Sequence, residues 1–245
     1  MSGQHNTGAT YAISLSGSTS ITAGTGVTLE SLNDNTGTIA LLSSGGIDGG
    51  SGTVLMRAAN YAFGGADRTI TTTGVLTIEP DADENSFASS FDNQYLNPVS
   101  VTGLTLGKSS NASAITLSRA ISLSGPVSIY GGSIDVNANI TANSGNILLD
   151  ADTGSTLNQS STGILLDDVI TIETVTSGNL TLIGRSGDTG SGFDGIDASS
   201  ANTTTLRSAG NLTLQGYSYA ASGSGRGVDL NLSLIHISEP TRHLL

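Results

Sequence analysis

Cysteine and tryptophan are absent from the sequence, and only 4% of its 245 residues are aromatic. A chain without cysteine forms no disulfide, which fits export through an oxidising compartment without disulfide pairing. Because aromatic side chains are so few, isoleucine, leucine and valine have to supply nearly all of the packing in a chain that is 36% hydrophobic. A core of this kind suits thin, repeated layers.

Basic residues are also scarce, since 8 lysines and arginines face 20 aspartates and glutamates. Phosphate binding needs clustered basic side chains, so nucleic acid is excluded as a partner, and an anionic membrane surface is disfavoured for the same reason. No run approaches the roughly 18 apolar residues of a spanning helix, so no membrane insertion is expected. The opening MSGQHNTGATYAISL lacks the basic and apolar regions of a signal peptide, so any targeting signal is expected outside this sequence.

A short motif recurs along the chain: a glycine, any residue, then two apolar residues separated by one other residue. It occurs as GTIAL at Gly37, GTVLM at Gly52, GSIDV at Gly132, GNILL at Gly145, and GNLTL at Gly178 and Gly210. Apolar residues two apart lie on one face of a strand, and glycine followed by asparagine lets the chain turn a corner. Each copy therefore predicts a short strand that buries its apolar face by stacking on similar strands.

Three apolar strands in the middle of the chain each find a counterpart about one coil later. The intervals are 19 residues from Ile115 to Ile134, 19 from Ile121 to Ile140, and 20 from Val127 to Ile147. This spacing predicts a three-sided coil of about 19–20 residues and, over residues 1–231, about 11 coils at the strand spacing of a sheet. The later intervals, 33 residues from Gly145 to Gly178 and 32 to Gly210, indicate either coils lengthened by loops or two coils per interval.

The expected fold class is therefore all-β, a parallel β-solenoid with loop insertions near residues 80–98 and 185–202. A β-sandwich is the rival, but its strands usually recur at shorter intervals and with more aromatic residues. Glycine at 33 positions disfavours helices throughout.

The stretch TGLTLGKSSNASAITLSRAISLSGPVSIYGGSIDVNANITANSGNILLDA, residues 102–151, resembles the repeat regions of filamentous-haemagglutinin-like large exoproteins of Gram-negative bacteria. The preceding GVLTIEPDADENSFAS is similar to a segment found before such repeats, and the likeness covers roughly residues 70–215. The resemblance implies a right-handed parallel β-helix displayed at the cell surface or released outside the cell for adhesion, and an outer-membrane secretion partner. The secretion domain of such proteins is missing here, so residues 1–231 are expected to be an internal fragment of a longer repeat protein.

Two acidic segments are the only candidates for a metal site, and calcium is the one cofactor they suggest. Asp81, Asp83, Asn85 and Asp92 occupy the first, third, fifth and twelfth places of a calcium-loop pattern. Ser86 stands where that pattern needs glycine, and Asp92 is shorter than the usual closing glutamate. Asp194, in GSGFDGID, partly matches a calcium-binding nonapeptide, but no second copy follows nine residues later. Both segments are expected to be solvated loops without metal.

Catalytic chemistry has little support, because His5 is the only histidine before residue 232 and a Ser-His-Asp relay needs one. We therefore expect no catalytic residue. A carbohydrate-active β-helix enzyme, a lyase or hydrolase, stays open as an alternative, and would be favoured by three carboxylates, or arginine with carboxylates, in one groove. A purely structural spacer is the third alternative.

The composition changes at residue 232, where LSLIHISEPTR, residues 232–242, resembles the in-frame translation of a transposase-type sequencing adapter. Residues 232–245 are therefore expected to be a non-native tail and are excluded from fold reasoning.

The sequence thus predicts an adhesin stalk or binding scaffold without catalysis. Its long inserts, around residues 81–97 and 185–202, are the expected contacts with host-cell or matrix glycans or proteins.

Overall fold

The computed structural model describes residues 2–4, 11–32, 37–42, 46–65, 67–151, 161–188, 191–198, 203–219 and 223–230, and the predicted tail lies outside them. Strands are the only regular elements of these residues, and all of their pairings are parallel. A search of the same residues for a helix long and apolar enough to cross a membrane finds none.

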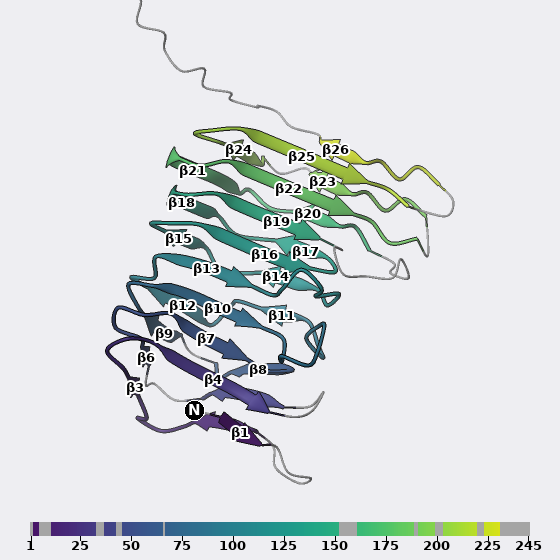
Figure 1. The fold of residues 1–245 in the computed structure, drawn as a ribbon. Coiled ribbons are helices and arrows are strands. Elements are labelled where there is room, and N and C mark those ends of the chain that lie inside the picture. The colour runs from purple at the N-terminus through teal and green to yellow at the C-terminus, as the bar shows by residue number, and fades with distance from the viewer. Residues whose placement is uncertain are drawn as a thin grey trace, which may run out of the picture.

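The chain is a right-handed parallel β-helix, so the expected fold class is confirmed. In Figure 1 the strands of the front sheet run from left to right while the chain climbs from bottom to top, which is a right-handed rise. Each coil has three sides, which we call the first, second and third face.

The first face is one uninterrupted sheet of nine strands. They are β1 (Ser2–Gln4), β4 (Val27–Leu32), β7 (Val54–Arg57), β10 (Val75–Glu79), β13 (Gly103–Leu106), β16 (Val127–Gly131), β19 (Ile147–Ala151), β22 (Leu180–Arg185) and β25 (Leu212–Tyr217).

The second and third faces are each divided into two sheets. The second face consists of β2 (Ile13–Leu15), β5 (Thr38–Leu41) and β8 (Asn60–Phe63), followed by β11 (Phe91–Asp92), β14 (Ile115–Leu117), β17 (Ile134–Val136), β20 (Ile164–Leu166), β23 (Ile196–Ala198) and β26 (Val228–Leu230). The third face consists of β3 (Ile21–Thr22), β6 (Ile47–Asp48), β9 (Arg68–Thr71) and β12 (Leu96–Val99), followed by β15 (Ile121–Leu123), β18 (Ile140–Ser144), β21 (Thr171–Ser177) and β24 (Thr205–Arg207).

The register of the middle coils agrees with the sequence spacing. The partners are Ile115 with Ile134, Ile121 with Ile140, and Val127 with Ile147, one pair on each face. The three-sided coil that this spacing predicts is therefore confirmed for this part of the chain.

Other coils are longer than the sequence spacing in the middle suggests. On the first face the offset between partners is shortest between Val127 and Ile147 and longest between Ile147 and Leu180. Because Ile147 pairs directly with Leu180, the later interval is one coil lengthened by a loop and not two coils. The described residues accordingly give the first face nine strands, fewer than the expected count of about 11 coils at one strand per coil.

Apolar side chains alternate inward along nearly every strand and form one continuous core. In β16, for example, Val127 and Ile129 are fully buried, whereas Ser128 and Tyr130 between and beyond them are partly exposed. This two-residue alternation is the pattern that the recurring motif predicts.

Aromatic side chains gather where the second face is interrupted, between β8 and β11. Tyr61, Phe63, Phe87 and Phe91 contact one another with ring centroids 5.6–6.2 Å apart. Phe87 comes from the connection between β10 and β11, so this insertion also fills the core. The Tyr61 hydroxyl donates toward the carbonyl oxygens of Met56 and Glu79, each 2.8 Å away, and burial raises its pKa well above the ordinary value.

Asparagines stack at the corner that leads into the first face. The backbone N–H of Asn179 donates to Oδ1 of Asn146 at 2.9 Å, and that of Asn211 donates to Oδ1 of Asn179 at 2.8 Å. Each asparagine follows a glycine, and Gly145 and Gly178 both have φ of 110°, a backbone conformation that favours glycine. The glycine-asparagine pairs thus form a hydrogen-bonded ladder between coils.

Candidate functional site

The longest connections between strands lie at one corner of the coil, between the first and second faces (Figure 1). They span residues 80–90, 107–114, 152–163, 186–195 and 218–227, of which 152–160, 189–190 and 220–222 lie outside the described residues. By contrast, only Gly145 and Asn146 separate β18 from β19 at the corner that enters the first face. We call the corner with the long connections the loop rim.

Each of the two segments expected to contact partners is part rim connection and part strand. The first, around residues 81–97, supplies nearly all of the rim connection 80–90, then β11 and the start of β12. The second, near residues 185–202, supplies the rim connection 186–195 and then β23, after which residues 199–204 lead to the third face. Both segments therefore contribute a connection to the loop rim.

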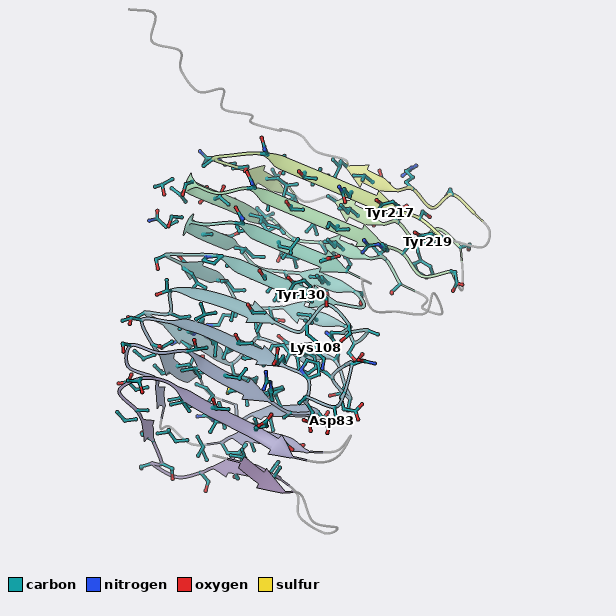
Figure 2. All side chains as sticks on the ribbon, viewed as in Figure 1. Asp83, Lys108, Tyr130, Tyr217 and Tyr219 are labelled. Carbon is teal, nitrogen blue, oxygen red and sulfur yellow. The ribbon has the colours of Figure 1, made fainter. Side chains whose placement is uncertain are left out.

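An arginine and two stacked tyrosines lie next to one another at this rim, and we call this group the tyrosine platform. The Tyr217 and Tyr219 rings are nearly parallel, 13° apart, with centroids separated by 6.4 Å, and their residues are 44% and 41% exposed. The Arg185 guanidinium lies 5.5 Å from the Tyr217 ring centroid, at cation–π distance. Figure 2 shows Tyr217 and Tyr219 on the same side of the molecule as Asp83, Lys108 and Tyr130.

Arg185 is held in place from the coil below. It donates to the Asp150 carboxylate at 3.1 Å and toward the carbonyl oxygen of Ala151 at 3.3 Å. Burial raises the pKa of the Asp150 carboxyl, while the hydrogen bond from Arg185 opposes that shift. Because the guanidinium is already paired with a carboxylate, the platform presents aromatic surface with little net charge.

Three carboxylates converge a short way along the same rim. Asp194 in the connection 186–195, Asp197 in β23 and Asp229 in β26 place one oxygen each within 4.8 Å of the others, the one such group in the described part of the chain. Asp197 and Asp229 are register partners in adjacent coils. A nonapeptide turn would place the partner of Asp194 nine residues onward, but this coil is much longer, and Asp194 meets Asp229 instead.

Arg226 already occupies two of these carboxylates. Its backbone N–H donates to Asp194 and its guanidinium donates to Asp229. The cluster offers the oxygen ligands that calcium prefers, but a cation there would compete with the guanidinium. Three carboxylates and an arginine therefore lie together, which is the grouping that the enzyme alternative needs, but the two pockets lined by residues 59–92 and by residues 20–71 include none of them.

The other predicted metal ligands do not gather into such a group. Asp81 is buried, and burial raises the pKa of its carboxyl, which accepts a hydrogen bond from the N–H of Ala82. Asp83 and Asn85 are exposed. Asp92 lies in β11, where its carboxylate accepts hydrogen bonds from the N–H of Gln94 and the hydroxyl of Ser118. The calcium-loop pattern is thus divided between a rim connection and a strand.

No protein-family model, curated protein or solved structure matches this chain.

Proposed function

We propose that this solenoid is a non-catalytic binding scaffold of a surface adhesin, and that the tyrosine platform on the loop rim contacts the partner. The partner class is a glycan or protein of a host cell or matrix. The resemblance of residues 102–151 to large exoprotein repeats supports display at the cell surface, with export through an outer-membrane partner.

One observation carries this proposal: Tyr217 and Tyr219 are exposed in a chain with few aromatic residues. Tyrosine and arginine are enriched among the residues that dominate binding energy at interfaces. Tyrosine combines a large apolar ring with a hydroxyl, so it packs against sugar rings or apolar side chains and still hydrogen-bonds. A rigid β-helix beneath such a surface reduces the ordering cost of binding.

Charge narrows the partner class further. The formal net charge of the chain is −12, so a polyanion is repelled. Arg185 is neutralised by Asp150, and the carboxylates of Asp194, Asp197 and Asp229 lie along the same rim. The rim therefore suits a neutral glycan or a protein surface with basic residues.

The test is binding of the purified chain to immobilised neutral glycans and matrix proteins, followed by substitution of the platform. The double variant Tyr217→Ala, Tyr219→Ala is expected to weaken binding about tenfold or more, since loss of an interface hot spot costs roughly 2 kcal/mol. Tyr95→Ala is the matched control, because Tyr95 lies in the turn between β11 and β12, away from the rim.

Unchanged affinity of the double variant would remove the platform from the proposal. Absence of binding to every glycan and protein tested would instead support the structural spacer.

A further inference from the structure

Four asparagines of the described residues begin an Asn-x-Ser/Thr triplet, the acceptor pattern for asparagine-linked sugars. They are Asn111 (Asn-Ala-Ser), Asn139 (Asn-Ile-Thr), Asn179 (Asn-Leu-Thr) and Asn211 (Asn-Leu-Thr). Further triplets at Asn158, Asn202 and Asn231 lie outside the described residues. The pattern alone does not separate usable from unusable acceptors, but the structure does.

Asn179 takes part in the asparagine ladder through its side-chain oxygen, and Asn211 through its backbone N–H. Both are exposed and belong to the asparagine ladder at the corner entering the first face. The ladder employs Oδ1 of Asn179, which accepts the N–H of Asn211, and no hydrogen bond to Nδ2 of either asparagine is present among the described residues. A sugar on Nδ2 is therefore compatible with the ladder.

Asn139 repeats this arrangement at the corner between the second and third faces. It is exposed, and its Oδ1 accepts the backbone N–H of Thr171 at 2.7 Å. Its Nδ2 likewise has no hydrogen-bond partner among the described residues. The Asn139 oxygen thus links two adjacent coils, and the residue that carries it is exposed.

The threonine of each of these triplets lies in the strand that its asparagine precedes. Thr181 stands between the buried Leu180 and Leu182, and Thr141 between the buried Ile140 and Ala142. Because side chains alternate along a strand, these two threonines point away from the core.

Asn111 shows the opposite arrangement. It is fully buried, and its Nδ2 donates to the carbonyl oxygens of Tyr130 at 2.8 Å and Ser113 at 3.3 Å. Its Oδ1 accepts the N–H of Phe87 at 3.2 Å. A sugar on this nitrogen is incompatible with the folded chain.

We propose that Asn139, Asn179 and Asn211 are acceptor sites for asparagine-linked glycosylation of the folded solenoid. In the reaction Nδ2 forms a bond to the anomeric carbon of a phosphate-activated sugar, the bond from that carbon to the phosphate oxygen breaks, and the phosphate leaves while the amide proton passes to a base of the transferase. No oxidant or reductant is required.

Glycans at Asn179 and Asn211 leave the tyrosine platform accessible. Asn179 directly precedes β22, whereas Arg185 is the last residue of that strand, so the two lie at opposite ends of about 20 Å of extended chain. The asparagine corner and the loop rim are thus separate edges of the first face.

Asn179 and Asn211 also compete with each other for space. They lie on adjacent coils about 4.8 Å apart, the spacing of paired strands. A hexose with its hydroxyls is wider than that, so one sugar is expected on this pair at a time.

The experiment treats the folded chain with a soluble asparagine-directed glucosyltransferase and nucleotide-activated glucose, and measures occupancy of each site by peptide mass spectrometry. Glucose is expected on Asn139 and on either Asn179 or Asn211. Thr181→Ala should abolish modification at Asn179 without altering the ladder, and should move occupancy to Asn211.

Two internal controls come from the chain itself. Asn146 belongs to the same ladder but has leucine two residues later, so it stays unmodified. Asn111 stays unmodified in the folded chain and becomes modified after unfolding. Modification of Asn111 in the folded chain at the level of the exposed sites would overturn the proposal, as would failure at all three sites while a free Asn-Leu-Thr peptide is modified.

Discussion

Asn111 joins three parts of the solenoid, and its replacement is the most informative test of how the rim insertion is held. Its amide contacts Phe87 in the connection 80–90, Ser113 in its own turn, and Tyr130 in the next coil of the first face. The side chain is fully buried. It therefore supplies hydrogen bonds that water does not replace.

Asn111→Ala leaves the N–H groups of Phe87 and Ser113 and the carbonyl oxygen of Tyr130 without this partner. An unsatisfied buried polar group costs about 1–3 kcal/mol, and partial relaxation of the turn recovers some of that cost. We expect the free energy of unfolding to fall by about 2–4 kcal/mol.

The assay is urea unfolding followed by circular dichroism, combined with hydrogen exchange to locate the loss. In a solenoid each coil contacts only its neighbours, so faster exchange is expected in β10, β13 and β16 and not in β22 or β25. Asn85→Ala is the matched control, because this exposed asparagine lies in the same insertion. Among the described residues its hydrogen bond is from the Ser110 hydroxyl to its backbone oxygen, which the substitution keeps.

A loss below about 0.5 kcal/mol, the size of an ordinary surface change, would refute the role assigned to Asn111. A loss of the same size in Asn85→Ala would point to a general sensitivity of the insertion.

Two further predictions concern stability. The pKa of the Asp135 carboxyl is raised above 3.8, mainly by burial. The hydrogen bond from Asn137 opposes this rise, and the charges of Asp167 and Asp92 add to it. The unfolded chain therefore loses this proton at lower pH than the folded chain. The free energy of unfolding therefore falls as pH rises from the pKa of this carboxyl in the unfolded chain to its pKa in the folded chain. Asp135→Asn is expected to raise the urea midpoint at pH 7 but not at pH 3. An equal rise at both pH values would contradict this argument. Gly178→Ala places a Cβ 1.9 Å from the Gly145 carbonyl oxygen at φ of 110° and is expected to cost more than about 2 kcal/mol, whereas Gly65→Ala meets open space and should change the midpoint little.

The strand pairs could be predicted from sequence where coils carry no insertion. Ile115, Ile121 and Val127 each find their partner at nearly the same interval because the corners between them are short. The apolar alternation also identified the buried face of these strands.

The sites could not be predicted in the same way, because each depends on a register across long coils. Asp197 and Asp229, or Arg185 and Tyr217, meet only when the offset of a lengthened coil is applied. The interval between Gly178 and Gly210 equals that offset, and applying it to Arg185 would have found Tyr217. The role of Phe87 had no such signal, because it lies in an insertion that does not repeat.

The arrangement of the three faces explains why insertions gather at the loop rim. The first face keeps one unbroken sheet although its coils differ in length, so the added length leaves the strand pairing intact. Lengthening a loop is inexpensive, since each doubling costs only about 0.6 kcal/mol of closure entropy. Insertions at the other corners would disturb the asparagine ladder or the short turns into the third face. The rim is thus the edge where the length of a coil can change with least effect on the strand pairing, and the tyrosine platform stands on it, anchored to the first face through Arg185 and Asp150.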